Sequence, residues 1–212
     1  MANDALVNVI DDDEGMRGAL GSLLRSAGFD VALHDTTHAF REVAAADIPS
    51  CLILDIRLKG ESGLDFQDWL VAEGRKIPVI LITGHGDIPM TVRGMRAGAI
   101  DFLPKPFSDE QLLDAVAKGI AKSREYLAMC TATAKLKQDF LRLSPREAEV
   151  MSLVVTGLMN KQIAARLELS EITVKIHRGN VMKKMEAQSL ADLVRMAEQL
   201  GIRDDSIHRF NM

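Results

Sequence analysis

The chain contains little cysteine, no long apolar run and no evident export signal. Only two of its 212 residues are cysteine, Cys51 and Cys130, and they lie far apart in the sequence. This argues against a cysteine zinc site and a secreted disulfide scaffold, and we expect both thiols to be reduced. No apolar run is long enough to span a bilayer, which argues against a membrane protein. Residues 1–5 lack the basic start and apolar segment of a signal peptide, so we expect a cytoplasmic protein without a membrane partner.

Apolar and charged residues are present in the proportions of a folded protein. Apolar residues make up 47% of the chain and charged residues 26%, which excludes disordered and collagen-like classes. The length permits one large domain or two small ones. Residues 1–123 hold 12 Lys and Arg against 19 Asp and Glu, a net charge of −7, whereas residues 124–212 have a net charge of +3. An acidic half followed by a basic half indicates two domains with different partners.

The first half alternates short apolar runs with helical stretches. The runs predict five strands, over residues 6–10, 31–34, 51–54, 79–82 and 100–103. Several helical stretches between them end at glycine, as at Gly28, Gly74 and Gly98. Strand–helix repeats of this length predict right-handed βαβ units, and nearly continuous apolar strands are typical of a sheet covered on both faces. We therefore predict an α/β domain with a doubly wound, five-stranded parallel sheet.

The second half reads as helices only. A capping box that begins at Ser108 starts a helix whose composition can continue to about Leu136, either as one long helix or as a helix and a linker. A second capping box begins at Ser144, with Pro145 in the first helical position. Further helices are predicted over residues 160–167, over 171–185 and after Ser189. We predict an α/β domain at 1–122, a helical linker at 123–139 and a small all-α, four-helix domain at 140–212.

Five polar side chains follow four of the predicted strands. Asp11 and Asp12 follow the first strand, Asp55 the third, Thr83 the fourth and Lys105 the fifth. Ligands of an open parallel sheet bind beyond the carboxyl ends of its strands, so these side chains are expected to meet at one rim. Clustered carboxylates need a proton or a cation, and hard oxygen ligands suit Mg²⁺. A carboxylate there can attack phosphorus while the lysine and threonine hold the phosphoryl oxygens.

Each of these signals also has a plain structural interpretation. Acids after a strand favour the first turn of a helix, which we expect for Asp13 and Glu14. A single aspartate after a strand is often a cap or turn residue, and Lys105 between two prolines can be a solvated loop lysine. Their occurrence at four strand ends in this order favours the phosphoryl site.

The first half resembles the receiver domain of two-component response regulators over residues 5–122. The resemblance is carried by VIDDDE at 9–14, LILD at 52–55, ITGHGD at 82–87 and DFLPKPF at 101–107. It implies a flavodoxin-like fold with Asp55 as the phosphoacceptor and Lys105 as the phosphate-contacting lysine. It further implies a Mg²⁺ site made by Asp11, Asp12, Asp55 and the backbone carbonyl of Arg57. Thr83 and Phe102 resemble the switch pair, and the bond before Pro106 is often cis in this family.

One departure from the family pattern lies in the loop after Asp55. Where these domains usually have Met-Pro, this chain has Leu58-Lys59, although Gly63 is in place. Losing the proline should loosen the loop, and Lys59 should bring a positive charge near the pocket.

The predicted helix over 171–185 has an apolar stripe and a basic side. Val174, His177, Val181 and Met185 fall on one face, so we expect His177 to pack or cap rather than to bind a ligand. The opposing side gathers Lys175, Arg178, Gly179 and Met182, with Lys183 beside them. Such a face suits DNA, because cations bind phosphates and a helix can enter the major groove. A bare glycine allows close approach; the plain alternative is a solvated face with a neutral glycine.

A helix, a tight turn and this basic helix form the helix-turn-helix arrangement. Residues 140–203 resemble the LuxR-type helix-turn-helix domain through LSPRE at 143–147, NK at 160–161, TVKIHR at 173–178 and VMKKM at 181–185. A receiver followed by this domain resembles the NarL/FixJ family of response regulators, on the FixJ side. The resemblance implies these DNA-binding residues: Lys161, Thr173, Lys175, Ile176, Arg178, Gly179 and Lys183.

The two resemblances together predict a transcription regulator rather than an enzyme. A sensor histidine kinase would phosphorylate Asp55, and a surface that includes residues 90–96, Phe102 and the start of the Ser108 helix would form a homodimer on double-stranded DNA. RNA polymerase is the expected further partner. An aspartate-nucleophile phosphatase would need a second carboxylate where Arg57 stands. The other alternative is a regulator that binds DNA without phosphorylation, with a vestigial receiver pocket, and the intact pocket residues argue against it.

Overall fold

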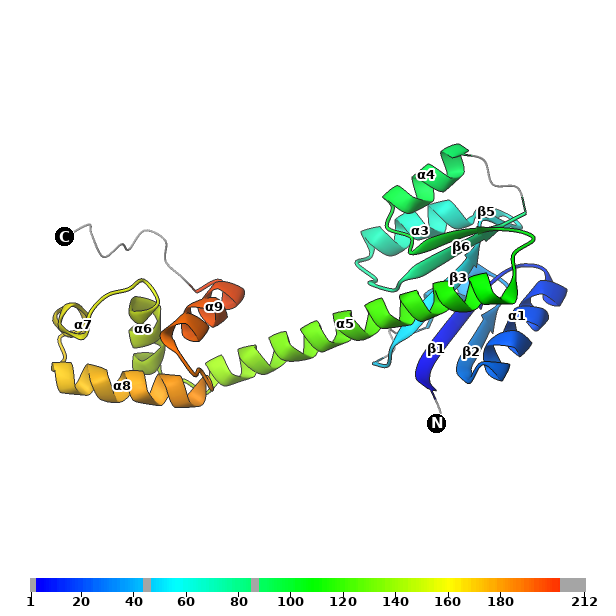
Figure 1. Ribbon diagram of the computed structural model, residues 1–212. Coiled ribbons are helices and arrows are strands. Elements are labelled where there is room, and N and C mark those ends of the chain that lie inside the picture. Colours follow the sequence, from blue (N-terminus) through cyan, green and yellow to red (C-terminus); the bar gives the residue numbers. More distant parts are fainter. Residues whose placement is uncertain (1–2, 44–46, 85–87, 203–212) are drawn as a thin grey trace. The chain divides into compact units, whose positions relative to one another are not determined.

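The computed structural model describes residues 3–43, 47–84 and 88–202. The chain divides into two compact units, Met1–Ala128 and Met129–Met212 (Figure 1). The division falls within the segment predicted as a helical linker, and that segment is helical throughout.

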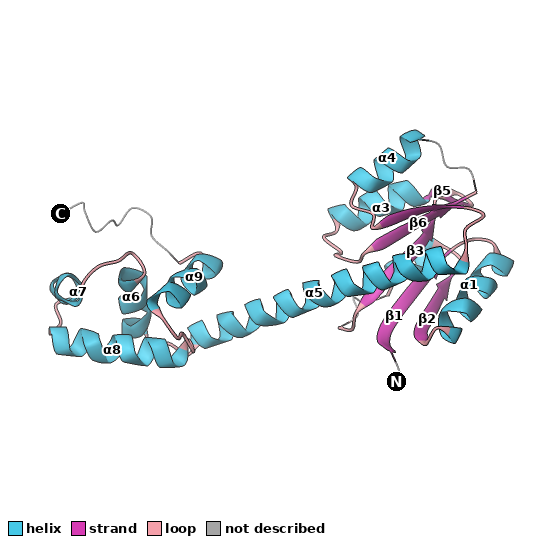
Figure 2. Ribbon diagram, viewed as in Figure 1, coloured by secondary structure: helices cyan, strands magenta, loops and turns pink. Residues whose placement is uncertain are grey.

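A five-stranded parallel sheet forms the centre of the first unit. Its strands are β1 (Asn3–Ile10), β2 (Phe29–His34), β3 (Ser50–Asp55), β6 (Val79–Thr83) and β7 (Asp101–Pro104), in the order β2-β1-β3-β6-β7 (Figure 2). All neighbouring pairs in this sheet are parallel. The predicted strands and the doubly wound α/β fold class are confirmed.

Helices cover both faces of the sheet. They are α1 (Glu14–Ser26), α2 (Thr37–Arg41), α3 (Gly63–Ala72), α4 (Ile88–Arg96) and α5 (Asp109–Leu141). Leu24 of α1 and Val116 of α5 pack in one apolar cluster with the inward side chains of one face. Phe66 and Leu70 of α3 pack in a second cluster on the other face. Burying each such side chain contributes about 1.5–3 kcal/mol, which explains why the strands are apolar on both sides.

The glycines predicted to end helices have the backbone that this role needs. Gly28, Gly74 and Gly98 have φ of 87°, 66° and 90°. Glycine enters this left-handed region without the steric cost that a Cβ brings.

The segment after Asp55 is a short hairpin, and the prediction that the missing proline loosens it stays a prediction. β4 (Arg57–Leu58) pairs antiparallel with β5 (Glu61–Ser62), and Gly60 turns between them with φ of 87°. Directly after β5, a Cβ on Gly63 would lie 2.2 Å from the backbone oxygen of Asp55. Glycine at 63 therefore permits the close approach that brings the hairpin back to β3.

Helix α5 begins with the predicted capping box and continues without a break to Leu141, so the long-helix alternative holds. The Ser108 backbone N–H donates to Gln111 Oε1 at 2.9 Å, and the Gln111 N–H donates to Ser108 Oγ at 3.2 Å. Across the described ranges, no helix is both long and apolar enough to cross a bilayer.

Four short helices make up most of the second unit, as predicted. They are α6 (Pro145–Val154), α7 (Asn160–Leu167), α8 (Glu171–Lys184) and α9 (Leu190–Leu200). Val150, Met151 and Ile163 are fully buried between them, together with Val174 of α8. The Ser144 capping box is formed, and Ser170 and Ser189 cap α8 and α9.

Candidate functional site

The carboxyl ends of β1, β3 and β7 bring two carboxylates and one ammonium group into contact. Lys105 Nζ donates to Asp11 Oδ2 at 2.9 Å and to Asp55 Oδ2 at 2.5 Å. Both aspartates are buried. Residues 50 and 94 positions apart in the sequence meet here because parallel strands end at the same edge of the sheet.

The second oxygen of each carboxylate is held by backbone. The Asp13 N–H donates to Asp11 Oδ1, and the Arg57 N–H donates to Asp55 Oδ1, both at 2.9 Å. Asp13 itself caps α1 by accepting from the Met16 N–H, as expected, and this hydrogen bond lowers the pKa of Asp13. Both site carboxylates are therefore fixed in orientation.

The charges at this rim perturb one another. Burial raises the pKa of Asp11, although the hydrogen bond from Lys105 opposes the rise. Burial also lowers the pKa of Lys105, but its hydrogen bonds to Asp55 and Asp11 outweigh this effect, so the pKa of the ammonium lies above its ordinary value. One positive charge faces two negative ones, so the site keeps a net negative charge that favours the binding of a further cation.

Asp12 makes a different contact. Its Oδ2 lies 3.3 Å from Nζ of Lys59, at the turn of the β4–β5 hairpin, so Lys59 does place a positive charge beside the pocket. Among the residues that the structure describes, no three His, Cys, Asp or Glu side chains are grouped as a ready set of metal ligands. The predicted ligand set of Asp11, Asp12, Asp55 and the Arg57 carbonyl thus stays a prediction. Its chemistry fits Mg²⁺, because one or two carboxylates with waters suffice for that ion.

Thr83 and Phe102 lie on the neighbouring strands β6 and β7. Thr83 is fully buried, and its carbonyl accepts from the Lys105 N–H at 2.7 Å. Phe102 is half-buried against the cluster that contains Ile10 and Leu81. The Lys105–Pro106 bond is cis, as the resemblance suggested. This backbone hydrogen bond therefore holds Lys105 next to Thr83 at the end of β6.

Helix α8 presents the predicted apolar stripe to its own unit. Val174, Val181 and Met185 are buried, and His177 is half-buried, which confirms the stripe. The Nδ1 atom of His177 is buried and has no hydrogen-bond partner within the described part of the chain. Met182 was assigned to the opposing side, and this was wrong: it packs against the core of the second unit.

The predicted DNA-binding residues fall into two groups. Lys161 of α7 is exposed, as are Lys175, Ile176, Gly179 and Lys183 of α8. Thr173 and Arg178 are half-buried and engaged within the unit: Thr173 Oγ1 is 2.8 Å from Ser170 Oγ, and Arg178 donates to Asn160 Oδ1 at 2.6 Å.

Sequence reasoning missed Ile172 on the same helix. Its side chain is 74% exposed, and that of Ile176, one turn later, is 58% exposed. The four-residue spacing was a signal for a shared face, but an isoleucine alone does not reveal whether that face is covered.

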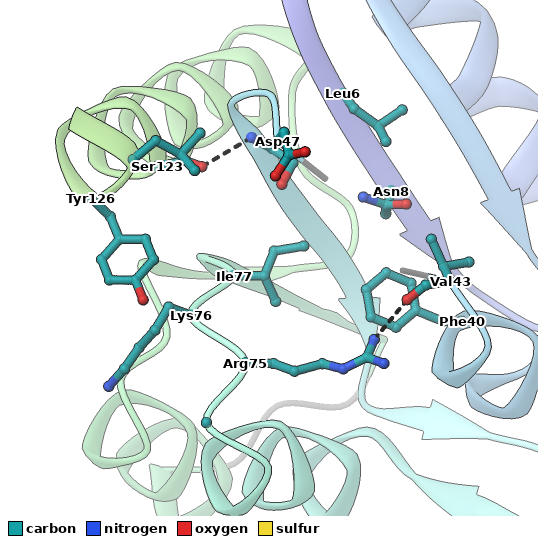
Figure 3. Close-up of a pocket in the computed structure, with 13 residues that line it drawn as sticks. Leu6, Asn8, Phe40, Val43, Asp47, Arg75, Lys76, Ile77, Ser123 and Tyr126 are labelled. Carbon is teal, nitrogen blue, oxygen red and sulfur yellow. Dashed lines mark hydrogen bonds between the residues drawn. The ribbon is translucent and has the colours of Figure 1, made fainter. Parts of the chain in front are cut away.

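The first unit also has a cavity of about 310 Å³ that none of the predicted site residues lines. It lies toward the amino ends of β1 and β3, between Leu6, Ile77 and Tyr126 (Figure 3). Arg75 crosses its wall and donates to the Val43 carbonyl at 3.1 Å. The Ser50 N–H donates to Ser123 Oγ at 3.0 Å. The cavity is separate from the carboxylate rim at the other ends of these strands.

A carboxylate–lysine site at the end of a parallel sheet and a helix-turn-helix bundle with an exposed basic helix define a signal-dependent DNA-binding regulator. Family matches agree with this class. Residues 7–117 match the response regulator receiver domain, and residues 141–197 match the bacterial regulatory proteins of the luxR family.

Relatives of similar length are found among known proteins. Nodulation protein W of Bradyrhizobium diazoefficiens is 54% identical over 198 residues, covering 93% of this chain and 87% of the relative. The transcriptional regulatory protein FixJ of that organism is 37% identical over 205 residues, covering 97% and 100%. The solved structure of response regulator StyR is 46% identical with a TM-score of 0.81, covering 92% of this chain and 99% of StyR. The chain belongs to the NarL/FixJ family of two-component response regulators, which are DNA-binding transcription regulators.

Proposed function

We propose that this response regulator is switched by transfer of a phosphoryl group from a sensor histidine kinase to Asp55. The observation that carries the proposal is the double contact of Lys105 with Asp11 and Asp55 at the carboxyl edge of the sheet. An oxygen of Asp55 attacks phosphorus, the phosphorus–nitrogen bond of the phosphohistidine breaks, and the electron pair leaves with the imidazole. The product is an acyl phosphate on Asp55.

Lys105 has the position to hold the new phosphate. The pKa of its ammonium group is raised, so the group stays charged at neutral pH. It can therefore move from the Asp55 carboxylate to a phosphoryl oxygen as negative charge develops there. The rim carboxylates would hold Mg²⁺, which when bound neutralises charge on the transferring group. Asp11 and Asp55 would contribute carboxylate oxygens, with Asp12 released from Lys59 and the carbonyl of Arg57 as further ligands.

Thr83 and Phe102 would relay the change to the surface. The threonine hydroxyl would bind a phosphoryl oxygen, and Phe102 on the adjacent strand would repack in response. Helix α4 would form part of the homodimer interface. This is supported by three exposed apolar side chains on the helix, Ile88, Val92 and Met95. A dimer would place two α8 helices on half-sites about one DNA turn apart, where the regulator would act on RNA polymerase.

The proposal is tested with the full chain, a small phosphodonor and Mg²⁺. We expect radiolabel on the wild type and on Asp13→Asn, a variant at the helix cap beside the site, but none on Asp55→Asn. Equal labelling of Asp55→Asn would overturn the phosphoacceptor assignment. Phosphorylated protein should also elute as a dimer and bind a DNA site, selected from a random library, more tightly than unphosphorylated protein. Equal DNA affinity in both states would favour the phosphorylation-independent alternative.

A further inference from the structure

The outer face of α8 combines exposed isoleucines with unpaired lysines. Ile172, Ile176, Gly179 and Lys183 are spaced by four, three and four residues, so they share one face of the helix. All four are exposed, and Lys175 lies beside them. Neither Lys175 nor Lys183 forms an ion pair with any described residue. This face therefore carries positive charge and apolar surface together.

Two observations favour DNA as the occupant of this face. The unpaired lysines suit phosphates rather than an apolar protein surface. A Cβ added to Gly179 would meet no described atom within 4 Å, so packing against the described residues does not require the glycine. Glycine weakens a helix interior, and its use here fits a surface that must come close to something outside the unit.

Isoleucine can read only one kind of group in the major groove. It has no donor or acceptor, and the apolar group on a base edge is the C5-methyl of thymine. A cytosine amino group or a purine acceptor pressed against an isoleucine would lose its water without gaining a hydrogen bond. Ile172 and Ile176 are separated by about 6 Å along the helix, a distance of about two base-pair steps.

We infer that Ile172 is a specificity-determining residue that selects a thymine through its methyl group, one helical turn before the contact made by Ile176. The inference rests on the proposed DNA-binding role of α8 and adds the base that this part of the helix reads. Residues at the start of a recognition helix are the ones that reach base edges, and Ile172 is the second residue of α8.

The test begins with a site selected from a random duplex library by the phosphorylated full-length protein. Each thymine of that site is then replaced in turn by deoxyuridine, which removes the methyl and leaves base pairing unchanged. We expect the position read by Ile172 in each half-site to lose affinity by about three- to five-fold, the factor for one buried apolar carbon, and a second position about two base-pair steps away to respond through Ile176. Ile172→Ala should bind the thymine site more weakly by a similar factor, and should no longer distinguish thymine from deoxyuridine at that position. Leu141→Ala, which truncates a similarly exposed side chain outside α8, should keep the wild-type distinction.

The outcomes separate this inference from the function on which it depends. A library in which no site is enriched would overturn DNA recognition and the inference together. A selected site that ignores every thymine methyl would overturn the inference alone, and so would a site at which Ile172→Ala keeps every deoxyuridine loss of the wild type. Equal thermal unfolding of Ile172→Ala and wild type is expected, because the side chain packs on so little of the unit.

Discussion

Lys59 Nζ lies 3.3 Å from Oδ2 of Asp12, across the mouth of the site that holds Asp11, Asp55 and Lys105. The lysine is at the tip of a hairpin, and its side chain is 85% exposed. If Asp12 is a ligand of the proposed Mg²⁺ site, an ammonium group in this position would compete with the cation for the same carboxylate. Exposed ion pairs are worth at most about 1 kcal/mol, so the competition is mild.

Replacing Lys59 should therefore tighten Mg²⁺ binding. We expect Lys59→Met to lower the Kd for Mg²⁺ by about two- to five-fold, the factor that corresponds to a weak surface ion pair. Isothermal titration calorimetry of the unphosphorylated protein measures this directly. Lys76→Met, which changes an exposed lysine at the amino ends of the strands, should leave the Kd unchanged. An unchanged or higher Kd for Lys59→Met would show that Lys59 does not compete.

Gly63 should tolerate no side chain. A Cβ there would lie 2.2 Å from the Asp55 oxygen, so Gly63→Ala must displace the hairpin or the end of β3. We expect a loss of about 1–3 kcal/mol in the free energy of unfolding, together with slower phosphorylation of Asp55. Urea denaturation and phosphodonor labelling measure the two effects. Gly18→Ala in α1 is the matched control: its Cβ would meet no described atom within 4 Å, and helix propensity should make the variant more stable by up to about 1 kcal/mol.

Much of the rim could be predicted from the sequence because strand ends are local features. Apolar runs mark the strands, and parallel strands bring their carboxyl ends together whatever the loops do, so Asp11, Asp55 and Lys105 were expected to meet. The Lys59–Asp12 pair depends on a two-residue turn, which no periodicity reveals.

The orientation of α8 was also hard to predict from the sequence. A helical wheel gives relative angles, but the neighbouring helices decide which side chains are covered, and this is why Met182 was misplaced and Ile172 was missed.

The second unit should lose stability in acid through one carboxylate. Glu147 is buried, accepts from Lys184 Nζ at 2.6 Å and from the Ser144 N–H at 2.8 Å, and these contacts lower its pKa from 4.5 to about 2. A carboxylate with a lowered pKa stabilises the folded state fully above pH 4.5, and this contribution disappears as the pH falls toward 2.

We expect Glu147→Gln to reduce the free energy of unfolding near pH 7 by about 1–2 kcal/mol, less than the shift alone implies because Lys184 is partly exposed. The difference between variant and wild type should shrink steadily between pH 5 and pH 2. Denaturation followed by circular dichroism across this range checks it. Glu149→Gln, at an exposed position of the same helix, should show no such convergence. A constant difference across the range would mean that the Glu147 charge is not what stabilises the fold.

Arg178 and Lys175 should affect DNA binding differently, although both were predicted as DNA contacts. Lys175 is exposed and free of ion pairs among the described residues, so Lys175→Ala should weaken DNA binding and lower the salt slope by about one, at unchanged stability. Arg178 is tied to Asn160 at 2.6 Å, which joins α8 to the start of α7. Arg178→Ala should therefore also cost about 1.5–3 kcal/mol of stability, the range for a hydrogen bond to a charged group.

Asn160→Ala separates the two roles of Arg178, because it breaks the same hydrogen bond but leaves the guanidinium in place. We expect it to reduce the free energy of unfolding about as much as Arg178→Ala does, while keeping the wild-type salt slope of DNA binding. Titrations of the selected DNA site at several salt concentrations, beside thermal unfolding of each variant, make the comparison. If Arg178→Ala and Asn160→Ala change DNA affinity and salt slope equally, Arg178 only orients α8 and makes no contact with the phosphates.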